Sequence, residues 1–308
     1  SGEQLCRIMD EIKQAFILSE DAEITMEANP GTVSPEQLKL CHEAGINRIS
    51  FGLQSTVQQE LDMLGRIHTY EEFLQSYHWA RKAGFSNINV DLMFAIPGQT
   101  CENWKHNLET IAELSPEHIS AYSLIIEEGT PFAQKKLILP AEDEEYQMYE
   151  DTAEILRKYG FHQYEISNYA RDGFECRHNK GYWQRTEYLG AGLGAASLFQ
   201  GKRFSNTRDM QTYLADSTEP EKIREDVTTL SRNNEIEEFM FLGLRMTEGI
   251  SERQFERNFG CRIEDIYGSV LAKYKEMDLL EHTGEFWRFT RKGIHVSNPV
   301  LADFLLDE

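Results

Sequence analysis

The sequence has little positive charge and no long apolar run. Its 308 residues include 31 Lys and Arg against 52 Asp and Glu, which gives a formal net charge of −21. Because clusters of Lys and Arg bind phosphate backbones, we expect no nucleic-acid partner. No run of 18 apolar residues occurs, so we expect no membrane span. A hydrophobic fraction of 40% excludes a disordered chain, and the length allows about two domains.

Cysteines are few and widely separated. The five stand at positions 6, 41, 101, 176 and 261, and none forms a Cys-x-x-Cys pair. This pattern is not typical of a zinc site or a disulfide framework, and it indicates a reducing compartment. The N-terminal residues lack the basic stretch and apolar core of a signal peptide. We therefore expect a cytoplasmic protein.

Helical patterns alternate with short apolar segments over residues 1–135. Strands are expected at 23–27, 48–52, 88–93 and 118–126. Three of the predicted helices end at a glycine just before a strand, at Gly45, Gly84 and Gly160, where a left-handed residue would turn the chain back. Such alternation predicts an α/β fold with βα units and a parallel sheet. A full or partial βα barrel fits these short strands better than an open sheet does.

The pattern changes towards the C-terminus. We expect one domain over 1–135, an extension over 136–232 and a C-terminal domain over 233–308. Three helix-like stretches in the last region (235–246, 251–258 and 263–277) precede a short hairpin, which is the outline of a winged-helix module. Because this region is not basic, we expect it to pack or to bind a partner rather than DNA.

Polar side chains occur where the predicted strands end. Glu27 and Gln54 lie at the ends of the first two strands, while Asp91 and Tyr122 lie within the third and fourth. The carboxyl ends of parallel strands meet at one rim, where functional residues gather. Arg66 follows the second strand and could clamp a carboxylate. Each of these side chains could equally cap a loop.

A histidine flanked by aromatic residues follows near the middle of the chain. His178 stands in Cys-Arg-His-Asn-Lys-Gly-Tyr-Trp, residues 176–183. Its imidazole could ligate a planar apolar cofactor such as haem, or it could be a structural histidine packed under Trp183. Further on, Gly190, Gly192 and Ala195 match a dinucleotide fingerprint, but no clear strand precedes them and the match is weak. We interpret these glycines as sites of close backbone packing.

Several motifs occur together in a fixed order. They are Glu-Ala-Asn-Pro-Gly-Thr at 27–32, Arg-Ile-Ser-Phe-Gly-Leu-Gln-Ser at 48–55, Leu-Gly-Arg-x-His at 64–68, Asp-Leu-Met-Phe-Ala-Ile-Pro-Gly-Gln-Thr at 91–100 and His-Asn-x-x-Tyr-Trp at 178–183. Together they closely resemble the radical S-adenosylmethionine family around oxygen-independent coproporphyrinogen III oxidase. The last motif favours the HemW branch, regarded as haem chaperones. The resemblance covers essentially the whole chain.

The resemblance implies a partial (β/α)₆ barrel with a [4Fe–4S] cluster and S-adenosylmethionine at the strand ends. By matching motif, Glu27, Gln54, Arg66 and Asp91 are expected to bind S-adenosylmethionine, and Ile125 to touch its adenine. Asp91 would suit the ribose hydroxyls and Arg66 the methionine carboxylate. The same motif matching implies that His178 binds haem.

The sequence lacks two motifs that are typical of the family. The cluster-binding Cys-x-x-x-Cys-x-x-Cys motif and the later Gly-Gly-Gly-Thr-Pro motif are absent, and residue 1 falls just after the second of them. We therefore expect a fragment that lacks the first two strands and the first helix of the barrel. It would hold no metal, and without a cluster it would not cleave S-adenosylmethionine. An uncovered sheet edge would favour self-association, so a homodimer is possible.

Three functions are compatible with these observations. The first is a haem-trafficking protein that binds haem or a porphyrin and delivers it to acceptor proteins. The second is an oxidase that removes carboxyl groups from coproporphyrinogen III propionates by radical chemistry. The third is an interaction protein that binds through its acidic surface and C-terminal module.

Overall fold

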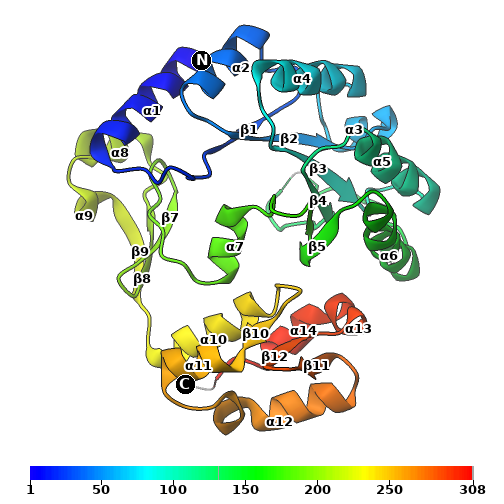
Figure 1. Cartoon of the computed structure of the whole chain (residues 1–308), viewed down its shortest axis with the longest axis vertical. Helices are drawn as coiled ribbons and strands as arrows, with labels where there is room; N and C mark the ends of the chain where they lie inside the picture. The colour runs from blue at the N-terminus through cyan, green and yellow to red at the C-terminus, as the bar shows by residue number, and fades with distance from the viewer. Residues whose placement is uncertain (131, 307–308) are drawn as a thin grey trace. The chain divides into compact units, whose positions relative to one another are not determined.

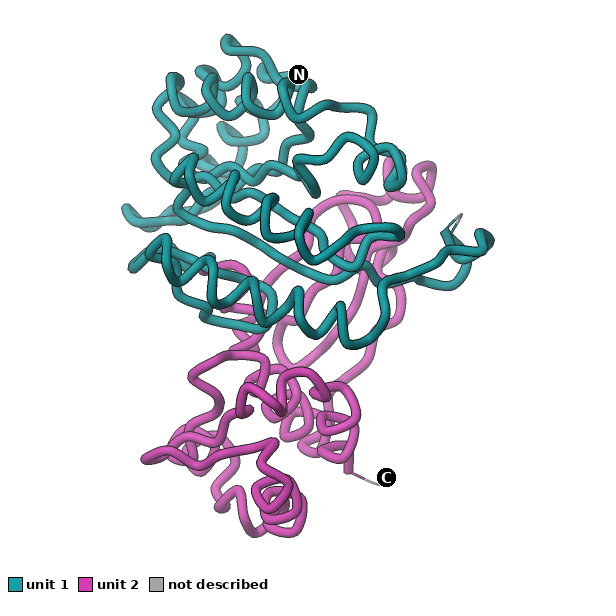
Figure 2. The backbone as a smooth tube through the Cα atoms, turned by 90° about the vertical axis from the view of Figure 1, so that its right-hand side faces the viewer, with its two compact units in different colours: residues 1–176 teal, residues 177–308 magenta. Residues whose placement is uncertain are grey.

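The computed structural model describes residues 1–130 and 132–306. The chain separates into two compact units, residues 1–176 and 177–308, which Figure 2 colours differently. No helix in the described ranges is both long enough and apolar enough to cross a membrane.

Strands and helices alternate in unit 1. Its elements are α1 (Gly2–Ala15), β1 (Thr25–Ala28), α2 (Pro35–Glu43), β2 (Arg48–Gln54), α3 (Gln58–Met63), α4 (Tyr70–Ala83), β3 (Ile88–Phe94), α5 (Cys101–Glu113), β4 (His118–Ser123), α6 (Glu142–Lys158), β5 (His162–Glu165) and β6 (Asn168–Ala170). All four strands expected from the sequence are present, although β4 ends three residues earlier than expected. Helices α4, α5 and α6 lie along the outer side of the sheet in Figure 1.

Local sequence signals fix the ends of these helices. Helix α2 begins with Pro35 after the N-cap Ser34, whose hydroxyl accepts a hydrogen bond from the backbone N–H of Gln37. The three predicted stop glycines, Gly45, Gly84 and Gly160, all have left-handed φ angles. Each returns the chain towards the next strand, as the sequence predicts.

The sheet of unit 1 is mixed. Its order is β1-β2-β3-β4-β6-β5, and the first four strands are parallel to one another. Strand β6 pairs antiparallel with β4, and β5 pairs antiparallel with β6. The expected parallel sheet is therefore confirmed for β1–β4 but not for the last two strands. Because β1–β4 run in the same direction, their carboxyl ends share one edge.

A buried apolar layer joins the sheet of unit 1 to its helices. Phe51, Val90 and Ile119 of the sheet pack with Phe73 of α4 and Trp104 of α5. The Trp104 indole N–H donates to the carbonyl of Met148 on α6 at 2.9 Å, so its one polar atom is satisfied inside the core. This packing holds the strand ends in a fixed arrangement.

Unit 2 begins with a short helix and two small sheets. Its elements are α7 (Arg177–Trp183), β7 (Ala196–Phe199), β8 (Lys202–Asn206), α8 (Met210–Asp216), α9 (Pro220–Ile223), β9 (Arg224–Thr229), α10 (Arg232–Gly243), β10 (Ile250–Ser251), α11 (Glu252–Phe259), α12 (Ile263–Glu276), β11 (Leu280–Thr283), β12 (Phe286–Phe289), α13 (Arg291–His295) and α14 (Ser297–Ala302). The sheets are β7-β8-β9 and β10-β12-β11, both antiparallel. The predicted helices and hairpin of the C-terminal region correspond to α10, α11, α12 and β11–β12.

The glycine-rich stretch in unit 2 packs backbone against backbone. A Cβ added to Gly190 would lie 2.3 Å from the carbonyl oxygen of Ala196, and Gly192 has a φ of +113°. No side chain fits at the first position, and the second conformation is rarely adopted by other residues. Close backbone packing is therefore confirmed at Gly190, whereas a Cβ at Gly192 would meet nothing within 4 Å, so glycine there serves only the left-handed conformation.

Candidate functional site

A polar cavity of about 560 Å³ lies at the carboxyl ends of β1–β4. Its volume falls within the range of about 300–1,000 Å³ that is common for small-molecule sites. The lining residues come from strand ends and from the segment that follows α3. They are Glu27, Ala28, Asn29, Ser50, Gly52, Gln54, Arg66, Asp91 and Tyr122.

Strand β2 contributes alternate residues to this cavity. Ser50, Gly52 and Gln54 lie two positions apart, so they project from the same face of the strand. A Cβ added to Gly52 would lie 3.2 Å from Nε2 of Gln54 and 3.7 Å from Oδ1 of Asn29. The missing side chain of Gly52 therefore leaves space between these two amides.

Gln54 is held in an unusual conformation at the end of β2. Its φ is +76°, in the left-handed region, and the residue is only 2% exposed. Its Oε1 accepts a 2.8 Å hydrogen bond from the hydroxyl of Tyr122 on β4. Strained backbone of this kind persists where surrounding structure enforces it and is common at functional sites. Burial, assisted by the charge of Asp91, raises the pKa of Tyr122 to about 12, so the phenol remains a donor.

The carboxylate of Asp91 is surrounded by hydrogen-bond donors. Oδ1 accepts from Nδ2 of Asn89 at 2.7 Å, and Oδ2 accepts from the hydroxyl of Ser50 at 3.1 Å. Burial raises the pKa of the Asp91 carboxyl, and the negative charge of Glu27 adds to this, whereas hydrogen bonds from Asn89, Ser120 and Ser50 oppose it. Asp91 is thus a desolvated acceptor at the base of the cavity.

A buried polar chain continues from Asp91 into the sheet. Oδ1 of Asn89 is 2.6 Å from Nδ1 of His118, and Nε2 of His118 is 2.8 Å from the hydroxyl of Tyr164. Burial lowers the pKa of His118 well below its usual value, and the charge of Arg48 acts in the same direction. The imidazole is therefore neutral, with its proton on Nδ1 because Asn89 presents an oxygen there. This chain fixes the amide of Asn89 so that its NH₂ group faces Asp91.

Arg66 is the cation of the cavity. Its Nη1 donates to Oδ1 of Asn29 at 3.2 Å. Within residues 1–130 and 132–306, no carboxylate lies at ion-pair distance from this guanidinium. Its remaining donors are therefore available to a bound carboxylate.

A second, less polar cavity of about 330 Å³ adjoins the first. Arg66 lines both cavities, and Met93, Leu124 and Ile125 contribute apolar surface to the second. Ile125 is 77% exposed and does not line the polar cavity. Apolar and polar surface thus meet at Arg66, an arrangement that suits a ligand with one flat apolar part and one charged part.

His178 belongs to unit 2, where it lies exposed on α7. Its ring contacts Tyr182 one helical turn later, with centroids 4.5 Å apart in an edge-on arrangement. The ring of Tyr182 contacts that of Tyr188 in the same way at 4.6 Å. The imidazole therefore packs edge-on against Tyr182, and the indole of Trp183 faces the guanidinium of Arg245 at 4.4 Å.

Ion pairs hold the C-terminal end of α7. Nε of Arg185 lies 3.0 Å from Oε2 of Glu238 on α10, and Nε of Arg203 on β8 lies 2.6 Å from the other oxygen of the same carboxylate. Glu238 is buried, so two guanidinium groups compensate its charge. These contacts join α7, α10 and β8 within unit 2.

No metal site is evident among the described residues. Residues 1–130 and 132–306 contain no group of three or more His, Cys, Asp or Glu arranged to hold a metal ion. The five cysteines form no disulfide and lie apart in the described chain, in α1, α2 and α5 and in the segments before α7 and α12. The residues present therefore do not fit a three-cysteine iron–sulfur site.

The structure brings together five of the residues that the sequence singled out, Glu27, Gln54, Arg66, Asp91 and Tyr122. Ile125 lies in the adjoining cavity and His178 in the other unit. Sequence reasoning did not select Asn29, Ser50 or Gly52. The two positions on β2 could have been found by counting back in twos from Gln54, because strand residues alternate between faces.

Two stretches of the sequence match known families. Residues 1–111 match the radical SAM superfamily, and residues 230–296 match the HemN C-terminal domain. The first stretch contains the polar cavity residues of β1–β3, and the second contains α10–α12 and the hairpin.

Relatives match along essentially the whole chain. The chain is 39% identical to the heme chaperone HemW of Lactococcus lactis over 100% of its own length and 82% of that protein. It is also 39% identical to HemW of Bacillus subtilis, over 99% and 82% of the two chains. The corresponding protein of Escherichia coli is 32% identical over 100% of this chain and 81% of that protein. The chain belongs to the HemW family of the radical SAM superfamily.

A solved structure supports the fold of this HemW family member. Coproporphyrinogen III oxidase (HemN) from Escherichia coli, described as a radical SAM enzyme, superposes with a TM-score of 0.85 at 21% identity. The match covers 99% of this chain and 74% of that protein. At this identity the likeness concerns the α/β fold with its mixed sheet.

Proposed function

We propose that this HemW family member is a haem chaperone that binds S-adenosylmethionine in unit 1 and haem through His178 in unit 2. The observation that carries the proposal is the exposed imidazole of His178 on its aromatic support, in a chain so similar to proteins named heme chaperones. Haem is the cargo, to be passed to acceptor proteins.

The polar cavity of unit 1 has the chemistry that S-adenosylmethionine requires. Glu27 and Asp91 supply negative charge that suits its sulfonium and ammonium groups, and Asp91 would accept hydrogen bonds from the ribose hydroxyls. Arg66 would pair with the methionine carboxylate, since it has no carboxylate partner among the described residues of this chain. Ile125 in the adjoining cavity would contact the adenine. When bound, S-adenosylmethionine supplies a sulfonium centre.

The [4Fe–4S] cluster of the superfamily, unlike S-adenosylmethionine, has no matching site among the described residues. The cysteines of these 308 residues do not fit it, and the proposed function assigns it no role. In our proposal S-adenosylmethionine stabilises the rim of unit 1, where its binding orders Glu27, Gln54 and Arg66 around one ligand.

We also propose a finer description of the fold. The sheet of unit 1 would be part of the (β/α)₆ barrel typical of radical SAM proteins, which the strand order β1-β2-β3-β4 supports. The functional divisions would be 1–135, 136–232 and 233–308. The last would be winged-helix-like, because α10, α11 and α12 accompany the sheet β10-β12-β11.

Titration with hemin tests the haem site. We expect a Soret shift that saturates at one haem per chain, and His178→Ala should weaken binding at least about tenfold, because an axial ligand is lost. His106→Ala, which removes another exposed histidine from α5, should bind as the unchanged chain does. Equal binding by the two variants would contradict the assignment of His178.

Two further measurements test the binding of S-adenosylmethionine and the release of haem. Calorimetric titration with S-adenosylmethionine should show binding that Arg66→Ala weakens, while its hemin affinity is unchanged. Transfer of bound haem to apomyoglobin, followed in the Soret band, tests whether the cargo can be released. Anaerobic conversion of coproporphyrinogen III by the protein would instead support the oxidase function.

A further inference from the structure

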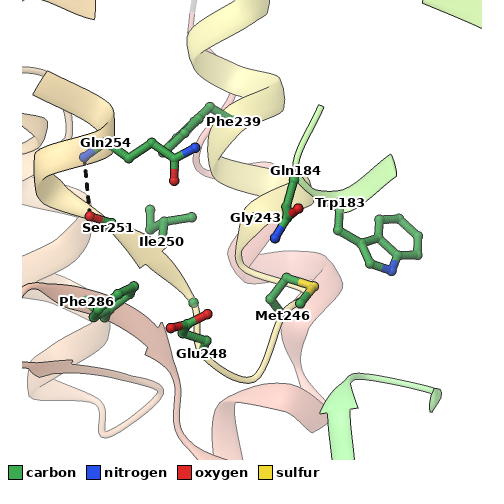
Figure 3. Close-up of a pocket in the computed structure, with 11 residues that line it drawn as sticks. Trp183, Gln184, Phe239, Gly243, Met246, Glu248, Ile250, Ser251, Gln254 and Phe286 are labelled. Atoms are coloured by element: carbon green, nitrogen blue, oxygen red, sulfur yellow. Dashed lines mark hydrogen bonds between the residues drawn. The ribbon is translucent and has the colours of Figure 1, made fainter. Parts of the chain in front are cut away.

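A small cavity of unit 2 is built by elements far apart in the sequence. Trp183 and Gln184 border it from the end of α7, and the remaining walls come from α10, the segment up to β10, α11 and β12 (Figure 3). Its volume is about 70 Å³. Sites for whole small molecules usually have about 300–1,000 Å³, so this cavity admits a group of side-chain size.

Part of the wall of this cavity is apolar and aromatic. Phe239 of α10, Met246, Ile250 of β10 and Phe286 of β12 supply its walls. Phe239, Met246 and Ile250 are buried, so they are held by the core of unit 2. Aromatic faces and a thioether favour a flat, weakly hydrated group over a strongly hydrated one.

The lining of the cavity also includes one charge and two amides. Gln184, Glu248 and Gln254 are among the lining residues drawn in Figure 3. Within the part of unit 2 that the structure describes, these three side chains make no hydrogen bond or ion pair. Their acceptor atoms are therefore available to a ligand in the cavity.

Neighbouring carboxylates differ from Glu248 in having side-chain partners. Oε1 of Glu252 lies 2.9 Å from Nε2 of His282, and Oε2 of Glu285 lies 3.0 Å from Nε of Arg253. Glu285 also accepts a hydrogen bond from the hydroxyl of Ser251 at 3.0 Å. Glu248 is thus the carboxylate at this cavity without a counter-ion among the described residues.

Two glycines keep the backbone of this region close-packed. A Cβ on Gly243 would lie 2.3 Å from Cγ2 of Ile250, and one on Gly249 would lie 2.1 Å from the carbonyl oxygen of Trp287. Gly249 also has a φ of +82°. The cavity therefore has a rigid frame, which lowers the entropic cost of filling it.

We propose that this cavity binds the side chain of an arginine presented by a protein partner. A guanidinium is planar and weakly hydrated, stacks on aromatic faces, and offers five donors to the carboxylate of Glu248 and the amide oxygens of Gln184 and Gln254. The net charge of −21 attracts basic partners to the chain. The proposal does not depend on haem or S-adenosylmethionine binding.

Carbon-13 methyl NMR of methionine tests the proposal, with n-butylguanidinium as the probe. Met246→Leu identifies the Met246 resonance, which should shift saturably as the probe is added. Glu248→Gln should raise the apparent Kd about tenfold or more. Glu256→Gln, the same change on α11 outside the cavity, should leave the Kd unchanged. The neutral n-butylurea should bind about tenfold more weakly than n-butylguanidinium.

The outcomes separate the proposal from a water-filled hole. Absence of a saturable shift, equal binding by Glu248→Gln, or equal binding of n-butylurea would each overturn it. The peptide acetyl-Gly-Arg-Gly-amide should reproduce the shift more strongly than acetyl-Gly-Lys-Gly-amide, and failure of the arginine peptide to bind would overturn the assignment to a protein side chain. Unchanged methyl signals from the other methionines establish that Glu248→Gln folds normally.

Discussion

The hydroxyl of Tyr122 on β4 donates a 2.8 Å hydrogen bond to Oε1 of Gln54 at the end of β2. The two strands are not neighbours, because β3 lies between them in the sheet. The bond therefore connects two non-adjacent strands and fixes a glutamine whose backbone is in the left-handed region. Tyr122 thus sets the position of Gln54, one of the residues expected to bind S-adenosylmethionine.

Tyr122→Phe should weaken S-adenosylmethionine binding roughly fivefold, since a neutral hydrogen bond contributes about 1 kcal/mol. Calorimetric titration measures the effect, and Tyr146→Phe, a similar change on the exposed surface of α6, should have none. If the hydroxyl acts through Gln54, the double variant Tyr122→Phe with Gln54→Ala should bind no more weakly than Gln54→Ala alone. Additive losses would mean that Tyr122 contacts the ligand itself.

Asp91→Asn should stabilise the fold while it weakens the binding of S-adenosylmethionine. Because the pKa of Asp91 is raised, the folded state keeps a proton that the unfolded state releases above its ordinary pKa, so stability is lost as pH rises through the folded pKa. The variant lacks this loss, and at pH 7 we expect it to be more stable by about 1 kcal/mol while binding S-adenosylmethionine more weakly. Urea unfolding from pH 4 to pH 7 measures the difference, which should grow with pH. A variant that is less stable at every pH would contradict the argument.

The sequence predicts much of unit 1 because its signals are local. Gly45, Gly84 and Gly160 end helices through their own backbone preference, and strands alternate with those helices as expected. The antiparallel pairing of β5 and β6 is not predictable in this way, since it depends on contacts with β4 rather than on residue pattern. The strand alternation confirms the α/β class without fixing how the sheet closes.

The sequence predicts some residues of the candidate site but not others. Charged and amide residues at strand ends, such as Glu27 and Asp91, are conspicuous, and the structure brings them into one cavity. Gly52 was not selected because its contribution is the space left by a missing side chain, which appears only when Gln54 and Asn29 are seen on either side. The hydrogen bond between Arg66 and Asn29 spans 37 positions, so residue spacing gives no sign of it.

Acid should destabilise the fold through His118. Its pKa is lowered well below 6.5 by burial, so below pH 6.5 the unfolded state binds a proton that the folded state does not. Stability is therefore full above pH 6.5 and falls as pH decreases, by up to about 1.4 kcal/mol per pH unit. Urea unfolding at pH 7.5, 6.5 and 5.5 should show a smaller decrease for His118→Gln, whose amide can still bond Asn89. The pKa of His68 is also lowered, but this histidine is present in both proteins, so its contribution to the pH dependence cancels in the comparison. Identical slopes would show that His118 is not neutral in the folded state.

Gly52→Ala should narrow the polar cavity between Asn29 and Gln54 without unfolding the protein. The backbone of Gly52 has no positive φ, so alanine is sterically acceptable to the strand itself. Its Cβ would nevertheless lie 3.2 Å from Nε2 of Gln54 and 3.9 Å from Nη1 of Arg66, inside the space that a ligand would occupy. We expect S-adenosylmethionine affinity to fall about tenfold or more while the unfolding free energy changes by less than about 1 kcal/mol. Gly268→Ala in α12 is the matched control, because its Cβ would meet Cβ of Glu264 only at an ordinary 3.8 Å. An unchanged affinity in Gly52→Ala, with normal folding, would mean that the ligand does not enter between Asn29 and Gln54.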